Sequence, residues 1–525
     1  MSAPMTASEP RTVTPGWPRA ALLSLSDKAG AAEFAKALAA HGTRIVASGG
    51  TAAHLEAAGL EVTPVERWTG VGEMLGGRVK TLHPNVHGPI LARRESADDM
   101  ATIEAGGLEP LDLVAVTLYP FESRGVTLDD AGMIEEIDIG GVALLRAAAK
   151  NHSGVIVLHD NAMYAEVLAA LERGVTLEER RSWALATFAR TARYDAAIAA
   201  ELARRSGADA TEPPATHVLA LERARTLRYG ENPHQGAALY ARAGGLQALA
   251  SWREGKELSY NNLLDLEAAV SLVWRFERPA CVIVKHNQPC GAACATTLVD
   301  AYSLALAADE LSAFGGIVAF NRTLDADTAR QLATHFVECV AFPEIAPEAD
   351  EALRGRKNLR LVKLSAANLA CADPWQVKLV GPWALLQRES PGEAPPWRTV
   401  TRRAPSAAEM TSMMFAWDVC AAARSNAIVL ARGEELVGLG SGQTSRVDAV
   451  DVALMKARRA GHDVHGSVLA SDGFFPFPDS VTHAAEAGVT AIVQPGGSVR
   501  DELTIEACKA AGVTMYFTGT RHFAH

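Results

Sequence analysis

Short apolar runs and amphipathic stretches alternate along the first two hundred residues. The apolar runs have the length and composition of strands buried on both faces. They lie at residues 20–24, 44–47, 113–117 and 155–158. The stretches between them, such as 28–40 and the segment up to Ala58, carry apolar residues at helical spacing, and 177–205 is a long helical region. Strands that alternate with helices predict a parallel α/β sheet covered on both faces.

The second half of the chain repeats this alternation. Strands are predicted at residues 281–285, 316–320, 427–431, 436–440 and 491–494, with a helix at 448–460. The stretch 366–397 has no sustained helical period, and 391–396 within it predicts a surface loop. About 300 residues can hold two subdomains of one unit.

Length and composition indicate where the chain divides into domains. A single core rarely exceeds about 250–300 residues, so 525 residues predict at least two domains. Residues 206–217 are rich in Gly, Pro and small polar residues and predict a linker. Residues 1–18 show no periodicity and predict a disordered extension. The domain limits are therefore 19–205 and 218–525.

Charge and cysteine content limit the classes of partner and the compartment that we expect. A net charge of −11 gives no global attraction for nucleic acid, so local Lys, Arg and backbone N–H groups must bind any phosphate. Seven scattered cysteines favour a reducing cytosol over a disulfide framework. No apolar run is long enough to cross a bilayer, and the N-terminus lacks a signal-peptide pattern. We expect a cytoplasmic protein with no nucleic-acid or membrane partner.

Polar residues follow the first two predicted strands. Ser48, Gly49, Gly50 and Thr51 stand between a strand and a helix, where free N–H groups can bind phosphate. Ser26 and Lys28 hold the corresponding place after the first strand. Because the carboxyl ends of parallel strands share one crevice, the two loops should converge. An ordinary strand-to-helix turn with simple caps is the alternative interpretation.

Further candidate residues lie in three polar segments of the same half. They are Arg78, Lys80 and Thr81 beside a glycine pair, Tyr119, Asp138 before two glycines, and Lys150 at the end of an Ala-rich run. Partial desolvation would raise the basicity of Asp138. For each segment alone, a solvated loop, a capping residue or a helix-end lysine is an equally good interpretation.

Taken in series, these segments resemble the IMP cyclohydrolase domain of the bifunctional purine-biosynthesis enzymes, over residues 19–205. The resemblance implies a methylglyoxal-synthase-like, Rossmann-type fold. It also implies that the site closes the ring of a formamido-imidazole-carboxamide ribotide (formyl-AICAR) to inosine monophosphate (IMP). Asp138 would accept the amide proton, Lys80 and Lys150 would stabilise the oxyanion, and Tyr119 would relay or orient. The contacts to ribotide and phosphate would come from Ser26, Lys28, Ser48, Gly49, Gly50, Thr51, Arg78 and Thr81.

The second half carries polar residues at strand ends and in glycine-bearing loops. Lys285 and His286 end a predicted strand, where catalytic side chains often project, and His can exchange a proton near neutral pH. Arg228 could grip a phosphate and Tyr229 could stack on a base. Asn426 opens a strand. For any one of these segments, a plain surface loop is the more common explanation.

As a series they resemble the AICAR transformylase domain of the same enzyme family, over residues 218–525. The implied fold is cytidine-deaminase-like, an α/β domain in two related subdomains. The implied reaction moves a formyl group from 10-formyltetrahydrofolate, a co-substrate, to the amine of AICAR. His286 would take the amine proton, Lys285 would stabilise charge or help protonate the leaving nitrogen, and Asn426 would donate to the oxyanion. The implied ribotide contacts are Arg228, Tyr229, Glu338, Phe474 and Arg521.

That fold name raises the possibility of zinc. Zinc deaminases combine His-x-Glu with Pro-Cys-x-x-Cys, whereas Cys294 here stands one residue too far from Cys290, and no His-x-Glu precedes them suitably. We expect no catalytic metal. The resemblance also implies a homodimer and the small-molecule partners AICAR, formyl-AICAR and folate. Two other hypotheses remain: a methylglyoxal-synthase-like lyase, and a regulatory nucleotide-binding module without catalysis.

Overall fold

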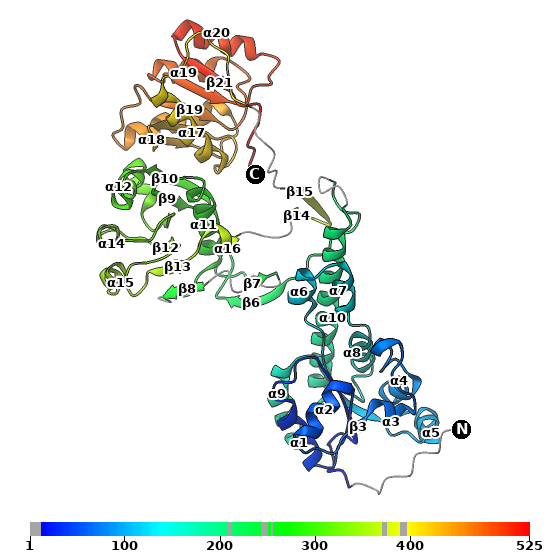
Figure 1. Ribbon diagram of the computed structural model, residues 1–525. Coiled ribbons are helices and arrows are strands. Elements are labelled where there is room, and N and C mark those ends of the chain that lie inside the picture. Colours follow the sequence, from blue (N-terminus) through cyan, green and yellow to red (C-terminus); the bar gives the residue numbers. More distant parts are fainter. Residues whose placement is uncertain (1–11, 208–211, 243–249, 254–255, 370–374, 389–395) are drawn as a thin grey trace. The chain divides into compact units, whose positions relative to one another are not determined.

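The computed structural model describes residues 12–207, 212–242, 250–253, 256–369, 375–388 and 396–525. The chain forms two compact units that divide between Leu221 and Glu222 (Figure 1). Within the described residues, no helix is both long enough and apolar enough to cross a membrane.

The first unit is built on a five-stranded sheet with the order β3-β2-β1-β4-β5, and every pair in it is parallel. Its strands are β1 (Ala20–Leu25), β2 (Arg44–Ala47), β3 (Thr63–Pro64), β4 (Leu111–Thr117) and β5 (Ile156–Leu158). β1, β2, β4 and β5 confirm the strands predicted from the apolar runs. All four of these strands are almost wholly buried, as a parallel sheet under helices requires.

Helices surround this sheet. They are α1 (Ala31–Ala40), α2 (Gly49–Ala57), α3 (Val65–Thr69), α4 (Pro84–Leu91), α5 (Ala97–Ala105), α6 (Phe121–Arg124), α7 (Asp130–Glu135), α8 (Gly140–Lys150), α9 (Tyr164–Arg173) and α10 (Leu177–Arg205), with 3-10 turns at Leu75–Gly77, Gly125–Thr127 and Asn161–Met163. The helix expected from residue 28 begins only at Ala31, because Gly30 adopts a left-handed conformation with φ 69°. The long α10 has the predicted limits and starts with a capping box between Thr176 and Glu179.

The packed part of this unit begins earlier than the predicted extension allows. Trp17 is 9% exposed. Its ring stacks on His41 with centroids 3.6 Å apart, and the Thr14 amide donates to the His41 carbonyl. Residues 12–18 therefore pack against the domain, because burying an indole is favourable. The remainder of the predicted extension, residues 1–11, lies outside the described residues.

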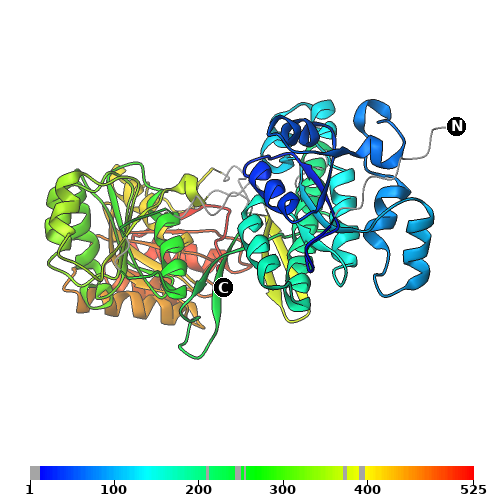
Figure 2. The same ribbon diagram turned by 90° about the horizontal axis from the view of Figure 1, so that it is seen from below.

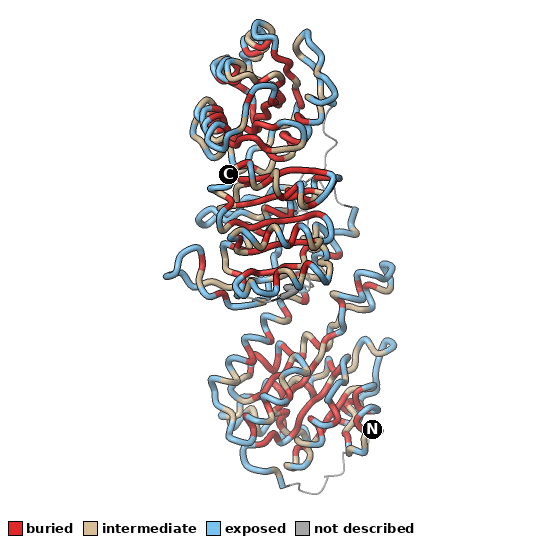
Figure 3. Tube along the Cα trace, turned by 90° about the vertical axis from the view of Figure 1, so that its left-hand side faces the viewer, coloured by how far each residue is buried: buried red, intermediate tan, exposed pale blue. Residues whose placement is uncertain are grey.

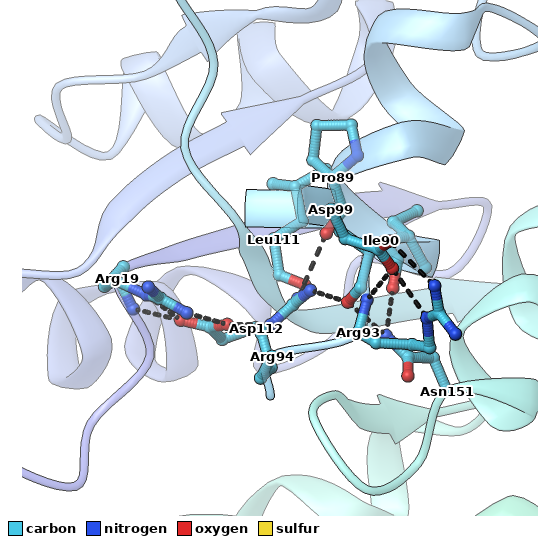
Figure 4. A network of polar contacts seen from close by, with 10 residues as sticks. Arg19, Pro89, Ile90, Arg93, Arg94, Asp99, Leu111, Asp112 and Asn151 are labelled. Carbon is cyan, nitrogen blue, oxygen red and sulfur yellow. Dashed lines mark hydrogen bonds and ion pairs between the residues drawn. The ribbon is translucent and has the colours of Figure 1, made fainter. Parts of the chain in front are cut away.

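A polar network ties the amino-terminal ends of the strands together (Figure 4). Asp112, at the start of β4, receives side-chain hydrogen bonds from Arg19 at 2.7 and 2.9 Å and from Arg94 at 3.0 Å. Arg94 also donates to the Pro89 and Leu111 carbonyls. Asn151 donates to the carbonyl of Ile90. These polar groups form hydrogen bonds with one another at the end of the sheet opposite the strand carboxyl ends. They therefore stabilise the fold and lie away from the candidate site.

The second unit contains a 12-stranded sheet of order β16-β21-β20-β19-β17-β18-β10-β9-β11-β12-β13-β8. Its strands are β8 (Ala250–Arg253), β9 (Ala280–Lys285), β10 (Gln288–Cys294), β11 (Ile317–Phe320), β12 (Cys339–Phe342), β13 (Arg360–Lys363), β16 (Arg398–Thr399), β17 (Ile428–Arg432), β18 (Glu435–Gly440), β19 (Val468–Ser471), β20 (Ala491–Gln494) and β21 (Thr514–Phe517). Two hairpins stand apart from it: β6 (Glu222–Leu227) with β7 (Ala237–Ala241), and β14 (Trp375–Val380) with β15 (Trp383–Arg388). The five strands predicted in this half are confirmed.

Helices cover both faces of the large sheet (Figure 2). α11 (Tyr260–Val273) and α17 (Ala407–Ala421) share one core with the sheet, and it extends across both halves. The opposite face is covered in one half by α12 (Leu298–Ala308), α13 (Glu310–Ala313), α14 (Ala326–Leu332) and α15 (Pro347–Leu353), and in the other by α18 (Arg446–Arg459), α19 (Asp479–Glu486) and α20 (Asp501–Ala511). A short α16 (Ala366–Leu369) follows β13. Buried residues follow the strands in both units (Figure 3).

The large sheet consists of two halves with the same plan. Outward from the central β10–β18 pair, one half runs β10-β9-β11-β12-β13-β8 and the other β18-β17-β19-β20-β21-β16. Each half starts with an antiparallel hairpin and ends with an antiparallel edge strand. Gly291 and Gly438 match as well: each pairs with the residue two before the end of the preceding strand, and a Cβ on either would overlap a helix carbonyl, of Ala305 and of Ala453 respectively. This repeat confirms the α/β fold class with two related subdomains.

The main departure from the predictions is the β14–β15 hairpin, which lies in the stretch 366–397. Leu379, Trp383 and Leu385 in it are 79%, 69% and 59% exposed. Neither face of the hairpin is well buried, so the hydrophobic alternation expected of a half-buried strand is weak. Of the predicted loop at 391–396, residues 391–395 lie outside the described residues.

Candidate active sites

The first candidate site surrounds the N-terminus of α2. Ser48 is the N-cap residue, and its hydroxyl lies 3.0 Å from that of Ser24. A Cβ placed on Gly49 would meet the Lys80 ammonium at 3.2 Å, and one on Gly50 would meet Cε of Lys28 at 4.0 Å. Two cationic side chains therefore lie beside the free N–H groups of a helix N-terminus. This arrangement suits a phosphate.

The hydroxyl groups of two predicted phosphate contacts have partners within the protein. The Thr51 side chain is 2% exposed, and its hydroxyl accepts from the Leu25 amide at 2.9 Å. The Ser26 hydroxyl donates to the Leu118 carbonyl at 2.7 Å. Thr51 thus fastens α2 to β1, and Ser26 fastens the first loop to the end of β4. Both side chains therefore anchor the loops that follow β1 and β2.

Lys80 reaches this site from a glycine-rich loop. Its ammonium lies 2.7 Å from a carboxylate oxygen of Glu73. Gly77, with φ 96°, passes so close that an added Cβ would lie 2.9 Å from Cε of Lys80. Arg78, one of the predicted substrate contacts, forms an exposed ion pair with Glu135. Such exposed pairs are weak, so an anionic ligand can replace Glu135.

The segment before α8 joins the same site. A Cβ on Gly140 would lie 2.8 Å from the hydroxyl of Thr81, so the Lys80–Thr81 stretch lies against the start of α8. The Asp138 carboxylate accepts from the Gly141 amide at 2.7 Å and from the backbone of Tyr119. The structure thus brings together Lys80, Thr81, Asp138 and the backbone of Tyr119, whose side chain is 47% exposed.

Burial raises the pKa of Asp138, and this effect outweighs the two backbone N–H bonds, which favour the charged form. A carboxylate in this state is a stronger base than one in water. Tyr194, which sequence reasoning did not single out, holds the segment: the Asp138 amide donates to its hydroxyl at 2.9 Å. That hydroxyl in turn donates to the Glu136 carbonyl at 3.0 Å.

Lys150 does not join this group within one chain. Asp138 lies just before α8 and Lys150 is its last residue, so the 11-residue helix separates them. At about 1.5 Å per residue the separation is roughly 16 Å. The two residues, which the resemblance places at one reacting centre, are therefore kept apart within one chain. Two adjoining pockets cover the intervening surface of α8 and share Arg146, one containing Asp138 and the other Lys150.

His87, also missed from the sequence, lines the pocket that contains Asp138. Burial lowers the pKa of its imidazole. Its Nε2 atom has no hydrogen-bond partner among the described residues. A buried, unpaired ring nitrogen would be hard to find from sequence, since a histidine in a Pro-bounded helix carries no periodic signal.

The second candidate site lies in the second unit, around the turn between β9 and β10. Lys285 pairs with Gln288, so His286 and Asn287 form a two-residue turn, with φ of 52° and 58°. His286 is exposed. The Lys285 ammonium donates to the carbonyls of Phe314 and Gly315 at 2.8 and 3.2 Å. The two predicted catalytic side chains are therefore adjacent and fixed at a strand end.

Asn426 lies in a buried polar network. Its Oδ1 atom accepts from Arg446 at 2.7 Å, and its Nδ2 atom donates to the Gln443 carbonyl at 3.0 Å. Because Nδ2 carries two hydrogens, one remains for a ligand. Arg446 also pairs with Asp472, which is fully buried. Sequence reasoning assigned no role to Arg446 or Asp472, because the buried ion pair between them becomes visible only in the structure.

The chain end and a glutamine connect these groups. The Arg424 amide donates to the Gln288 side chain at 3.1 Å, which brings the β9–β10 turn beside the Asn426 segment. The Ser425 amide donates to the Ala524 carbonyl, and the His522 amide to the Asp472 carbonyl, each at 3.0 Å. The terminal residues thus build the site.

The remaining predicted contacts lie around the start of α11 and near the chain end. The Arg228 guanidinium lies 4.7 Å from the Tyr229 ring centroid. The Glu338 carboxylate accepts from Asn262 at 3.1 Å. Phe474 is 38% exposed, and Arg521 lies over the Phe523 ring at 4.8 Å. Arg228 and Tyr229 therefore present a cation and a ring, and among the described residues no hydrogen bond or ion pair joins either of them to Glu338.

The cysteines that the structure describes in this unit are buried. Burial raises the pKa of both Cys290 and Cys294 to about 12, which leaves them as neutral thiols. In the described part of the chain, no group of three or more His, Cys, Asp or Glu side chains is arranged to hold a metal ion.

Comparison with known proteins covers both units. The family model of the AICARFT/IMPCHase bienzyme matches residues 148–456, and the model of the MGS-like domain matches residues 30–143. A protein of Persephonella marina named bifunctional purine biosynthesis protein PurH is 46% identical over 517 residues, covering 97% of this chain and 100% of that protein. Proteins of the same name from Acaryochloris marina and Cereibacter sphaeroides are 46% and 47% identical, over 97% and 96% of this chain and 100% and 98% of their own lengths.

Proposed function

Since this chain belongs to the AICARFT/IMPCHase bienzyme family, whose two reactions transfer a formyl group to AICAR and close formyl-AICAR to IMP, we propose that each reaction has its own site in its own unit. We assign ring closure to residues 19–205 and formyl transfer to residues 218–525. The observation that carries the proposal is the separate clustering of two sets of groups. Lys80 lies beside the N-terminus of α2, and its neighbour Thr81 lies against the start of α8 next to Asp138. Lys285 and His286 share one strand end in the other unit.

Ring closure requires the carboxamide nitrogen to attack the formyl carbon, after which water leaves. An amide nitrogen is a poor nucleophile, so a positioned base and a cation both help. Asp138, whose burial strengthens it as a base, takes the amide proton as the bond forms. Lys80 stabilises the charge that develops on the formyl oxygen, and Tyr119 orients the substrate. The N-terminus of α2 and Lys28 hold the ribotide phosphate.

Lys150 takes part if two copies pair through α8. In an antiparallel pairing of this helix with its copy, Lys150 of the second copy meets Asp138 of the first, and the carboxylate and ammonium are complementary. Apolar side chains on the facing surfaces support such a contact: Ile139 and Phe188 are 60% and 38% exposed. Ring closure is then carried out by a homodimer in which each site draws a lysine from its partner.

Mixed dimers test this arrangement. Asp138→Asn and Lys150→Ala should each abolish ring closure alone. Co-expressed, they form heterodimers in which one site holds both native residues, so about a quarter of the native rate should return if the chains mix at random. If both variants are inactive and mixing restores nothing, Lys150 does not act across copies.

Formyl transfer follows a similar logic at the second site. The amine of AICAR attacks the formyl carbon, His286 takes the amine proton, and Lys285 helps protonate the departing nitrogen of the donor. Asn426 donates to the tetrahedral oxyanion through its remaining N–H. The amine is weakly nucleophilic, so holding both substrates in register matters. Arg228, Tyr229, Glu338, Phe474 and Arg521 contact the ribotide, and 10-formyltetrahydrofolate is the donor.

One assay tests the whole assignment. The protein is incubated with AICAR and 10-formyltetrahydrofolate, and IMP is followed by absorbance. Omitting the folate should abolish IMP, whereas supplied formyl-AICAR should still cyclise. His286→Ala should lose formyl transfer and keep ring closure, and Asp138→Asn should do the reverse. A lyase or a non-catalytic nucleotide-binding module would give no IMP under any of these conditions.

The compartment and the partners follow from the same proposal. The substrates are small anions, so neither a nucleic acid nor a membrane is needed as partner. The described cysteines are free, which suits the reducing cytoplasm in which we place the reaction.

A further inference from the structure

The β9–β10 turn puts His286 in a backbone conformation that histidine seldom adopts. His286 and Asn287 have φ of 52° and 58°, and Lys285 pairs with Gln288 across them. Two consecutive positive φ values define a type I′ turn, which Asn-Gly and Gly-Gly sequences favour. A side chain with a Cβ is disfavoured there by its clash with the following carbonyl.

The other half of the sheet offers an internal comparison. Its equivalent hairpin joins β17 to β18, with Arg432 paired to Glu435. The turn between them is Gly433–Glu434, in which only Gly433 has a positive φ, of 58°. The position that holds histidine in the first half is therefore a glycine in the second. The His286–Asn287 turn holds two consecutive positive φ values without a glycine, so it needs an outside contact to stabilise it.

Asp265, on α11, supplies that contact. Its carboxylate accepts a hydrogen bond from the Asn287 amide at 2.6 Å. The backbone of His286 also forms a hydrogen bond with it. With its amide nitrogen turned toward α11, the Asn287 side chain donates to the Leu264 carbonyl at 3.1 Å and to Asp265 at 3.2 Å. One carboxylate on a rigid helix thus binds both residues of the turn.

We propose that Asp265 is a positioning residue for formyl transfer, which holds the His286–Asn287 turn so that the imidazole faces the substrate amine. This role rests on the proposed function of His286. Asp265 contacts backbone groups of the turn, so its effect on the reaction passes through the orientation of His286. The carboxylate is partly withdrawn from solvent, and burial is the largest influence on its pKa, which is raised.

Four variants of the full-length protein test the role. Asp265→Ala removes the acceptor, and we expect kcat for formyl transfer to fall at least tenfold with KM for AICAR within twofold. Asp265→Asn keeps an acceptor oxygen and should retain most of the rate. Asn287→Gly favours the type I′ turn by itself, so in the Asp265→Ala background it should restore most of the lost rate. Glu267→Gln, an exposed change on the same helix, is the matched control.

The outcomes separate the possibilities. Thermal unfolding, compared with that of Glu267→Gln, reports whether the second unit of each variant folds, and ring closure in the other unit should be unchanged. If Asp265→Ala keeps its formyl transfer rate, or if Asn287→Gly fails to restore it while Asp265→Asn is equally impaired, the positioning role is overturned, because charge or stability is then what matters. If His286→Ala itself keeps formyl transfer, the proposed function of the turn fails instead, independently of Asp265.

Discussion

The hydroxyl of Tyr194 lies 2.9 Å from the Asp138 amide nitrogen and 3.0 Å from the Glu136 carbonyl oxygen. One buried phenol on α10 thus fixes the segment that carries the proposed base. Burial raises the pKa of Tyr194 to about 12, so the hydroxyl stays protonated and can donate at any working pH.

Tyr194→Phe should therefore weaken both stability and ring closure. It leaves the Asp138 amide and the Glu136 carbonyl without their partner, which costs about 1–3 kcal/mol in the free energy of unfolding. We expect a slower ring closure and an unchanged formyl transfer. Urea unfolding followed by tryptophan fluorescence, with both activities assayed, measures the effect.

Tyr164→Phe provides the control for that experiment. The Tyr164 hydroxyl is buried and has no partner among the described residues, and its ring stacks on Phe34. Removing the hydroxyl should leave stability and activity unchanged. Equal losses in the two variants would contradict the anchoring role of Tyr194.

Asp138→Asn should make the first unit more stable at neutral pH while abolishing ring closure. Burial raises the pKa of Asp138 in the folded state, so between the ordinary aspartate pKa and this raised value the folded chain binds more protons than the unfolded chain. Stability therefore falls as pH rises through that window. Asparagine avoids this loss, and its oxygen can still accept from Gly141.

Thermal unfolding over a pH series checks this prediction. The stability gap between Asp138→Asn and the native chain should be largest at neutral pH and close as pH falls below the ordinary aspartate pKa. The rate of ring closure in the native chain should also fall with acidification through the raised pKa. A gap that is constant with pH would show that Asp138 is not desolvated.

Arg446→Met should destabilise the second unit strongly. Asp472 is fully buried, and Arg446 is its ion-pair partner. Removing one member of a buried pair costs about 3–5 kcal/mol, because the other charge is left without compensation. Formyl transfer should be lost as Asn426 loses its orienting bond. Arg459→Met, an exposed change on the same helix, should shift the midpoint of unfolding by little, and a similar shift in both variants would contradict the prediction.

Deleting the residues from His522 onward should abolish formyl transfer and spare ring closure. The deletion removes the Ala524 carbonyl that holds Ser425 and the His522 amide that holds Asp472. Asn426 would then be supported on one side only. Assays of both reactions on the truncated chain decide the matter, since a loss of both would indicate general misfolding and retention of both would show that the chain end is dispensable.

The sequence predicts the regular part of this fold well. Strands such as β2 and β20 and the helix α10 have their predicted limits, because burial on both faces and helical spacing are local signals. The β14–β15 hairpin was missed because its apolar residues are exposed. The candidate sites were also predicted in part. The loops that follow strands were predicted from their glycines and lysines.

Hydrogen bonds between residues far apart in the sequence were not predicted. Tyr194 and Asp138, or Asp265 and Asn287, meet only because helices fold back onto loops. Asp138 and Lys150 are the reverse case, since two residues that are near in sequence lie at opposite ends of one helix.

The two-half plan of the large sheet has a consequence for ancestry. Two halves with one strand order, joined edge to edge at β10 and β18, are what an internal duplication of a single ancestral module would leave. The Gly433 turn then remains a plain connection between two strands, and the His286 turn is the copy that acquired chemistry. An ancestor made of one such module could have formed the same sheet only by self-association. The covalent repeat removed that requirement and freed one copy to diverge.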